Sequence, residues 1–227
     1  MTKPPTDAGP LGLFGGTFDP IHFGHLRLAE EAREALGLDR VCFIPAGRPP
    51  HRDAPQSTPA DRLAMVRLAI ADNPAFAVDD GEVLAEGKSY TVLTLERLRT
   101  EHGADRPLVL ILGADAFQGL PTWHRWHEIL RLAHVAVANR PGYSPHGRRW
   151  PATLSPELDS ACAGRIGTDP RVLRAEAAGR VVPFDMTPLA ISASRVRDLI
   201  GAGHSARYLL PDSVLDYIGL HHLYPGT

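Results

Sequence analysis

The expected fold follows mainly from the segment Gly15-Gly16-Thr17-Phe18-Asp19-Pro20-Ile21-His22-Phe23-Gly24-His25. The apolar segment Leu11 to Phe14 comes directly before it and predicts a buried strand. The segment from Leu26 to Leu36 follows it, is rich in strong helix formers and ends at Gly37. The glycines and histidines therefore lie on a turn between a strand and a helix. Backbone N–H groups at a helix start have no intrahelical partner, so this turn is a natural anion site.

His22 and His25 are three residues apart and can share one face of the helix start. With the glycines they predict a phosphate-binding turn with a cationic or hydrogen-bonding rim. The turn is not a P-loop, because it lacks the Lys-Ser/Thr pair, and its glycine spacing does not match the dinucleotide-binding fingerprint. Two alternatives stay open: a plain glycine turn with surface histidines, or half of a zinc site. The cysteines offer no ligand cluster for zinc.

Composition indicates a globular protein. The chain has 227 residues, of which 44% are hydrophobic and 22% charged, enough for one sizeable core. A net charge of −2 gives no indication of nucleic-acid or membrane binding, and no apolar run approaches the length of a membrane span. Cys42 and Cys162 are widely separated, as expected for free thiols in a reducing compartment. We therefore expect a cytoplasmic protein without nucleic-acid or membrane partners.

The domain organisation is expected to be simple. Residues 1–10 are rich in Pro, Gly and Thr, lack a signal-peptide pattern and predict a flexible tail. Residues 11–227 are expected to form a single domain, with a small helical part from about residue 188. The short apolar strand predicted at Arg40 to Pro45 follows the first helix, and a strand–helix–strand crossover of this length implies parallel pairing in an α/β sheet.

Other elements follow from local patterns. The most apolar strand, Pro107 to Leu112, should lie centrally in the sheet. Further strands are predicted at 75–78, 134–138 and 181–184, and helices at 61–72, 92–101, 122–130, 192–201 and 212–218. In the second helix Leu63, Val66 and Ile70 should face the core, with Arg62 elsewhere. Residues 142–178 are expected to be irregular, with one helix near 170–177.

A second motif is Ile191-Ser192-Ala193-Ser194-Arg195-Val196-Arg197. The hydroxyls of Ser192 and Ser194 at a helix start can cap the helix and donate to anionic oxygens. Arg197, one turn further on, carries a planar charged fork suited to phosphate. The alternative is an ordinary N-cap followed by a solvated basic helix.

Together the two motifs resemble the (T/H)xGH and ISSTxxR signatures of the nucleotidyltransferase superfamily. The longer form GGTFDPxHxGH, matched by residues 15–25, is similar to its nicotinate mononucleotide adenylyltransferase branch. Ala193 departs from the second signature, so no hydroxyl contact is expected there. Further segments resemble signatures of that branch in the same order: Pro49-Pro50-His51-Arg52 (with arginine in place of lysine), Ser89-Tyr90-Thr91, Gly113-Ala114-Asp115, Thr122-Trp123 and Arg140-Pro141-Gly142.

The resemblance implies a Rossmann-like parallel α/β sheet flanked by helices. It also implies transfer of the adenylyl group of ATP, accompanied by Mg²⁺, to nicotinate mononucleotide, which gives deamido-NAD and pyrophosphate. The implied catalytic residues are His22, His25 and Arg197; the ATP-binding residues are Gly15, Gly16, Thr17, Phe18, Gly113, Asp115, Ser192 and Ser194; the substrate-binding residues are His51, Arg52, Tyr90, Thr91, Trp123 and Arg140. Trp123 would stack on the pyridine ring and Trp126 would pack in the core. Asp115 would bind a ribose hydroxyl or approach the metal, and no dedicated protein metal site is implied.

Three alternatives remain at this point. A related nucleotidyltransferase acting on another phosphate ester would share both phosphate motifs. A preference for the amidated mononucleotide is the nearest alternative. A catalytically idle nucleotide-binding protein belongs to a different class, and the intact His22, His25 and Arg197 argue against it. The oligomeric state stays open, a homo-oligomer included.

Overall fold

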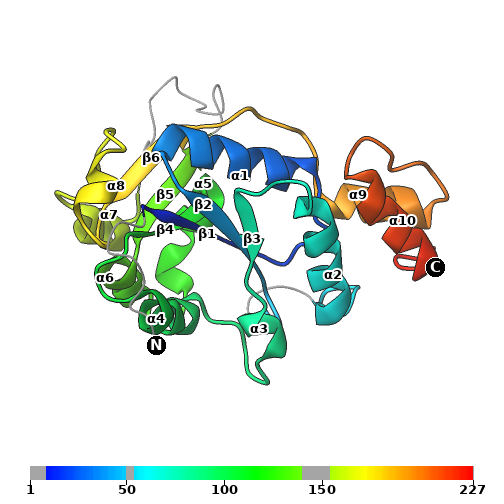
Figure 1. Cartoon of the computed structure of the whole chain (residues 1–227), viewed down its shortest axis with the longest axis horizontal. Coiled ribbons are helices and arrows are strands. Elements are labelled where there is room, and N and C mark those ends of the chain that lie inside the picture. The colour runs from blue at the N-terminus through cyan, green and yellow to red at the C-terminus, as the bar shows by residue number, and fades with distance from the viewer. Residues whose placement is uncertain (1–8, 50–53, 140–153, 227) are drawn as a thin grey trace.

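A computed structural model describes residues 9–49, 54–139 and 154–226 of the chain. These residues contain a parallel sheet of six strands in the order β3-β2-β1-β4-β5-β6 (Figure 1). The strands are β1 (Leu11–Gly16), β2 (Arg40–Pro45), β3 (Phe76–Val78), β4 (Leu108–Gly113), β5 (His134–Asn139) and β6 (Val181–Asp185). The central position expected for the most apolar strand is confirmed, because β4 pairs with both β1 and β5.

Helices connect the strands and cover both faces of the sheet. They are α1 (Phe23–Leu36), α2 (Pro59–Ile70), α3 (Gly81–Leu84), α4 (Thr91–His102), α5 (Ala114–Gln118), α6 (Ile129–Leu132), α7 (Pro156–Cys162), α8 (Val172–Ala175), α9 (Ala193–Gly201) and α10 (Asp212–Leu220). The expected Rossmann-like α/β class is therefore confirmed. In Figure 1, α9 and α10 lie at one end of the molecule, beyond α2.

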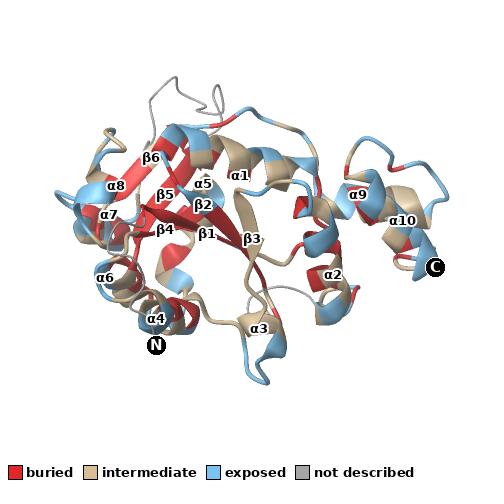
Figure 2. Cartoon of the chain, in the orientation of Figure 1, coloured by how far each residue is buried: buried red, intermediate tan, exposed pale blue. Residues whose placement is uncertain are grey.

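The core consists of two apolar clusters, one on each face of the sheet. Along β4, Val109 and Ile111 belong to the cluster beneath α1 and α2. Leu108, Leu110 and Leu112 belong to the cluster beneath α4, α5 and α6. This alternation follows from the two-residue period of a strand, and burial of both faces explains why the strand reads as a continuous apolar run. Figure 2 shows the buried strands between helices whose outer sides are exposed.

Local signals in the sequence explain where α1 and α2 begin and end. Gly37 ends α1 in the left-handed conformation, at φ 62°, and its N–H reaches the last carbonyls of the helix. Thr58 caps α2: its hydroxyl oxygen accepts from the N–H of Asp61 at 3.1 Å, and the Asp61 carboxylate accepts from Thr58 in return. Pro59 occupies the first turn, where its missing N–H costs no hydrogen bond.

The prediction of a single helix over residues 122–130 is wrong. Arg125 adopts the left-handed region, at φ 51°, and separates two short 3₁₀ turns that precede α6. Its guanidinium forms ion pairs with Glu96 and Glu128, each at 2.6 Å. Because a continuous α-helix needs right-handed backbone at every residue, the segment bends at this position. Helices α3, α5 and α7 were also not expected.

Arg62 was expected away from the buried side of its helix, and this is wrong. The side chain is fully buried. Its guanidinium donates to the carbonyls of Thr17 and Gly47, both at 2.9 Å, and also to the carbonyl of Ala46. Helix α2 therefore fastens the loops that follow β1 and β2.

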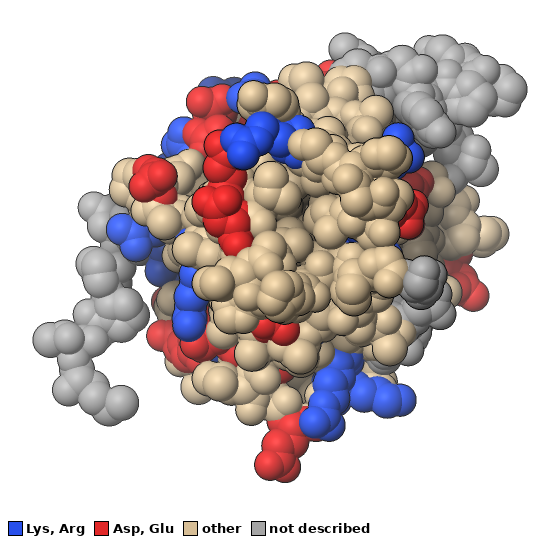
Figure 3. All heavy atoms as spheres, turned by 90° about the vertical axis from the view of Figure 1, so that its right-hand side faces the viewer, with Lys and Arg blue, Asp and Glu red and all other residues tan. Residues whose placement is uncertain are grey.

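Cys42 and Cys162 are unbridged, as expected, and both are buried. Burial raises the pKa of the Cys42 thiol to about 12 and that of Cys162 to about 11. Among the described residues, none of the helices combines the length and the apolar composition that a membrane span requires. On the face shown in Figure 3, basic and acidic side chains lie beside one another around a largely uncharged surface.

Candidate active site

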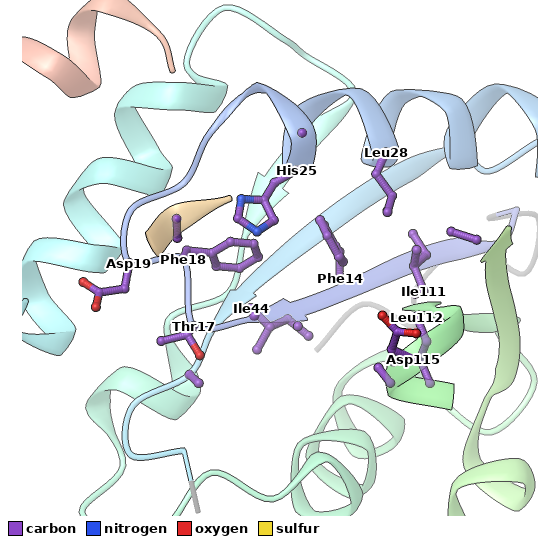
Figure 4. A pocket seen from close by; sticks show the side chains of 18 of the residues that line it. Phe14, Thr17, Phe18, Asp19, His25, Leu28, Ile44, Ile111, Leu112 and Asp115 are labelled. Atoms are coloured by element: carbon purple, nitrogen blue, oxygen red, sulfur yellow. The ribbon is translucent and has the colours of Figure 1, made fainter. Parts of the chain in front are cut away.

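A cavity of about 1260 Å³ lies at the carboxyl ends of the strands, where open parallel sheets bind ligands (Figure 4). It brings together both phosphate-type motifs and part of the expected substrate site. The predicted residues on its wall are Gly15, Gly16, Thr17, Phe18, His22, His25, Thr91, Gly113, Asp115, Trp123, Ser192, Ser194 and Arg197. Tyr90 is not on the wall, and its ring packs against His124 with centroids 4.5 Å apart. The remaining predicted residues, His51, Arg52 and Arg140, lie outside the described residues.

The two histidines share one side of the start of α1, as their spacing predicted. Their imidazole rings stack with centroids 3.8 Å apart and an interplanar angle of 23°. The backbone N–H of His22 donates to Nδ1 of His25 at 3.3 Å. Because Nδ1 of His25 accepts this bond, Nε2 carries the proton in the neutral ring. The pair therefore presents a defined hydrogen-bond donor rather than two unrelated surface imidazoles.

His22 is buried in the free protein, with 5% of its surface exposed. Burial lowers the pKa of His22 to about 4, so the ring is neutral at pH 7. Its Nδ1 is buried and finds no hydrogen-bond partner among the described residues. Buried polar atoms in proteins nearly always have partners, so an orphaned ring nitrogen beside the cavity is consistent with a ligand site. The sequence left open whether the rim of the turn is cationic or hydrogen-bonding. Because the His22 ring is neutral, it can act as a hydrogen-bonding group but not as a cation.

The ring of Phe18 packs against His25 and so supports the stacked pair of histidines. Its backbone is in the left-handed region, at φ 51°, and its side chain is 2% exposed. The ring meets the edge of His25 at a centroid distance of 5.1 Å and packs against Phe14 and Phe43 at 5.6 and 5.8 Å. In Figure 4, His25 reaches from α1 toward the Phe18 ring. The unusual backbone of Phe18 is therefore stabilised by aromatic packing that also fixes His25.

The glycines on the cavity wall differ in what surrounds them. A Cβ at Gly15 or at Gly113 would meet no atom within 4 Å, whereas one at Gly16 would lie 2.7 Å from the Phe18 ring. Gly16 is thus required by packing within the protein. Gly15 and Gly113 leave open space on the cavity wall, which permits close approach of a ligand to the backbone.

The second motif forms the opposite part of the wall, at the start of α9. The hydroxyl oxygen of Ser192 caps the helix by accepting from the N–H of Arg195 at 3.2 Å. Arg197 donates to the backbone carbonyl of Asp19 at 2.7 Å and approaches the Ser194 hydroxyl at 3.4 Å. The arginine of one motif is thus attached to the backbone of the other. Arg195, which occupies a variable position of the signature, is exposed.

Asp19 was missed as a site residue. Its side chain is 6% exposed and lies 3.8 Å from the Arg197 guanidinium. Its carboxylate accepts from the N–H of Gln56, from the N–H and hydroxyl of Ser57, and from the hydroxyl of Tyr224. In Figure 4 the Asp19 side chain points away from His25 and toward α2. Asp19 is therefore a residue of the cavity wall whose carboxylate links the histidine turn to the rest of the protein.

A third part of the wall surrounds Thr91 and Trp123. The Ser89 hydroxyl accepts from the N–H groups of Gly47 and Arg48 at 2.9 and 3.2 Å, which joins this segment to the loop after β2. Glu82, also missed, lies on the cavity wall, and burial raises the pKa of its carboxyl. The hydroxyl of Thr94 donates to it at 2.6 Å. Glu82 lies in the charged segment 79–82, and no pattern in that segment indicates that its side chain lines a cavity.

Both motifs point to a site that binds a chain of phosphates from two sides, which is the arrangement of a nucleotidyltransferase. The comparisons agree: the cytidylyltransferase-like family model matches residues 13–199. A relative from Dechloromonas aromatica (strain RCB), described as "Probable nicotinate-nucleotide adenylyltransferase", is 59% identical over 96% of this chain and 99% of its own length. One with the same description from Pseudomonas paraeruginosa is 47% identical over 94% of this chain and 96% of its own. The chain therefore belongs to the cytidylyltransferase-like family, and within it to the nicotinate-nucleotide adenylyltransferases.

Solved structures resemble the fold. The Plasmodium falciparum nicotinic acid mononucleotide adenylyltransferase complexed with NaAD matches with a TM-score of 0.69 and 12% identity, over 95% of this chain and 97% of that one. The same enzyme complexed with APC matches with a TM-score of 0.67 and 13% identity, over the same shares. At these identities the likeness concerns the arrangement of the sheet and helices.

Proposed function

We propose that this protein transfers the adenylyl group of ATP to nicotinate mononucleotide, forming deamido-NAD and pyrophosphate in NAD biosynthesis. One observation carries the proposal: the histidine turn and the Ser192–Arg197 motif line the same cavity as Thr91 and Trp123. The first two features suit a triphosphate, and the third suits an aromatic ring with a polar substituent. The names of the relatives support the same substrates.

The reaction requires the protein to align the two substrates more than to activate the nucleophile. A phosphate oxygen of nicotinate mononucleotide attacks the α-phosphorus of ATP. The bond from the α-phosphorus to the bridging oxygen of the β-phosphate breaks, and pyrophosphate leaves. The nucleophile is already ionised at neutral pH, so no protein base has to remove a proton. The protein contributes by positioning the reactants and stabilising the charge that moves onto the leaving group.

We assign His25 to the phosphate oxygens that gain charge, with Nε2 as the donor. His22, neutral because it is buried, can also contribute a hydrogen bond. Arg197 and the hydroxyls of Ser192 and Ser194 are assigned to the β and γ phosphates from the other side. Donors held in place before the reaction need no reorganisation during it, and this is the main advantage of such a site.

The rest of the wall is assigned to the two nucleotides. Gly15, Gly16, Thr17, Phe18 and Gly113 would line the ATP, where a bare backbone permits close contact. Thr91 would hydrogen-bond the nicotinate carboxylate, and Trp123 would stack on the pyridine ring. His51, Arg52, Tyr90 and Arg140 stay predicted substrate contacts.

Mg²⁺ is proposed to arrive with ATP. No cluster of three or more His, Cys, Asp or Glu side chains suited to a metal occurs in the described part of the chain. Triphosphate oxygens and water would therefore supply most ligands, as is usual for this ion, and Asp115 on the cavity wall fits as an added carboxylate. When bound, the ion would neutralise phosphate charge. The two buried free thiols support the expected cytoplasmic location.

One experiment separates the candidate substrates. The purified protein is incubated with ATP and Mg²⁺ and, in separate reactions, nicotinate mononucleotide, its amide or phosphopantetheine, and pyrophosphate release is measured. We expect the highest kcat/KM with nicotinate mononucleotide and a product with the mass of deamido-NAD. A higher kcat/KM with the amide would identify the other pyridine nucleotide as the substrate. Release only with phosphopantetheine, or no release at all, would contradict the proposal.

A further inference from the structure

We propose that Tyr224 is a positioning residue for adenylyl transfer. Its hydroxyl holds the carboxylate of Asp19, and the backbone carbonyl of Asp19 in turn holds the guanidinium of Arg197 at the cavity. The inference rests on the proposed function. It assigns a role in catalysis to Tyr224, which lies three positions before the last residue of the sequence and does not line the cavity.

The first link joins Tyr224 to Asp19. The Tyr224 hydroxyl donates to Oδ1 of Asp19 at 2.8 Å, although 205 residues separate them. It also lies 3.2 Å from the Ser57 hydroxyl, which donates to the same carboxylate oxygen at 2.5 Å. Tyr224 is 4% exposed. Burial raises the pKa of Tyr224 well above its usual range, so the phenol keeps its proton and remains a donor.

The backbone of Tyr224 also shows that its position is specified. It lies in the left-handed region, at φ 58°, which is unfavourable for a bulky side chain. Such a conformation persists only where the surroundings determine it. Here the buried ring and its hydrogen bond to Asp19 provide those surroundings.

The second link joins Asp19 to both halves of the site. Asp19 lies three residues before His22, in the turn that carries the histidines. Its carbonyl accepts the hydrogen bond from Nη1 of Arg197 at 2.7 Å. The second hydrogen bond of this guanidinium, from Nη2 to Ser194, is long at 3.4 Å, and the Asp19 carboxylate lies 3.8 Å away. The buried Nε of Arg197 has no partner among the described residues. The Asp19 carbonyl is therefore the main contact that orients Arg197.

The two links transmit position because the Asp19 carboxylate is held from several directions. Oδ2 accepts from the N–H of Gln56 at 2.9 Å, and Oδ1 accepts from both groups of Ser57 and from Tyr224. Loss of the tyrosine hydroxyl removes the donor that comes from the C-terminal segment. We expect the carbonyl of Asp19 to shift, and Arg197 with it. A displacement of about 1 Å in a phosphate-transfer site can lower the rate about 100-fold.

The test compares Tyr224→Phe with Tyr217→Phe. Tyr217, in α10, donates to the carboxylate of Asp61 at 3.0 Å, so the control removes the same kind of bond outside the cavity. We expect Tyr224→Phe to lower kcat about 10- to 100-fold and to raise KM for ATP, with KM for nicotinate mononucleotide changed less than about twofold. Tyr217→Phe should keep kcat within about twofold. A Tyr224→Phe variant with normal kcat would overturn the inference.

A second comparison separates positioning from stability. In an Arg197→Met background no guanidinium is left to position, so Tyr224→Phe should change kcat less than about twofold. A full additional loss in that background would show that Tyr224 acts elsewhere and would overturn the inference. If Tyr224→Phe does not fold, Ser57→Ala removes another donor to Asp19 and is measured with and without Arg197→Met, with the same two outcomes. Absence of pyrophosphate release by the wild-type protein would instead refute the proposed function.

Discussion

The backbone N–H of His22 donates a hydrogen bond to Nδ1 of His25, and the rings of these two residues stack 3.8 Å apart. This contact does more than start a helix. When the His25 ring is neutral, this bond places its proton on Nε2. The His22 ring is itself buried, and burial keeps it neutral at pH 7. The two histidines of the motif lie side by side but differ in their hydrogen bonds. Nδ1 of His25 accepts one, whereas Nδ1 of His22 has no partner among the described residues.

The Nε2 assignment predicts the order of activity among substitutions at His25. His25→Ala should lower kcat by about two to three orders of magnitude, the usual effect of removing one oriented donor. His25→Gln should retain more activity than His25→Asn, because the longer amide reaches the position of Nε2 and the shorter one that of Nδ1. Steady-state kinetics with all three variants, at equal folded fraction by circular dichroism, checks this. Equal activity of the Gln and Asn variants would contradict the assignment.

The low pKa of His22 predicts an acid-dependent loss of stability. Between about pH 6.5 and 4 the unfolded chain binds a proton at this residue that the folded protein does not, so the free energy of unfolding falls as the pH falls through this window. From pH 7 to pH 5 we expect a loss on the order of 2 kcal/mol from this residue alone. Urea unfolding at both pH values measures it. His22→Gln, which does not titrate, should lose that much less, and identical losses would contradict the burial of a neutral ring.

Substitution of glycine by alanine is expected to have different effects at Gly15 and at Gly16: it should weaken ATP binding at the first and stability at the second. Gly15→Ala adds a methyl group to open space on the cavity wall, so we expect an unchanged melting temperature and a raised KM for ATP. Gly16→Ala places the methyl group 2.7 Å from the Phe18 ring, so it should lower the melting temperature and disturb His25 through that ring. Thermal unfolding and ATP titrations distinguish the two. An unaltered KM in Gly15→Ala would show that no ligand approaches this residue.

Trp123 and Trp126 form a second matched pair. Trp123 lies on the cavity wall, whereas Trp126 is 7% exposed and packs in the core. Trp123→Ala should raise KM for the pyridine nucleotide and should cost less stability than the second substitution, because Trp123 is only half-buried against the same apolar cluster. Trp126→Ala should instead destabilise the protein by about 3–5 kcal/mol. Substrate titration and chemical denaturation of both variants decide the matter, and a Trp123→Ala variant with normal KM would return Trp123 to a packing role.

Arg62 predicts a large effect from a residue that touches no substrate. Arg62→Met leaves the carbonyls of Thr17 and Gly47 without their buried donor, which should lower the free energy of unfolding by about 2 kcal/mol or more. The control is Arg67→Met in the same helix, which loses only an exposed ion pair with Asp80 and should cost less than about 1 kcal/mol. Denaturant titrations compare them. Equal costs would contradict the role of Arg62 in fastening the two loops.

Much of the sheet was predictable because its strands are short apolar runs that end in proline, glycine or polar residues. The strand Arg40–Pro45 was predicted with the bounds it has, and β1 and β4 differ only at their ends. The motif residues on the cavity wall were also predictable, since they follow strand ends or begin helices, where backbone groups face a ligand. Their assigned roles remain predictions.

The missed features depend on contacts between distant parts of the chain. Arg62 is buried because carbonyls from two other loops converge on it, and nothing within α2 indicates this. The break at Arg125 involves an ion pair with Glu96, which is 29 residues away. The donors to Asp19 come from 37, 38 and 205 residues along the sequence. Local periodicity carries no information about such partners.

The bond between Asp19 and Tyr224 has a consequence for the order of events on the ribosome. At a synthesis rate of about 5–20 residues per second, Asp19 exists for roughly 10–40 s before the residue that donates to it is made. The sheet can begin to form in that interval, but the turn that carries the histidines lacks this hydrogen bond until residue 224 has been added. A premature stop codon at any position from 26 to 224 would therefore yield a chain that has the first phosphate motif, or both motifs, but never the tyrosine that connects them.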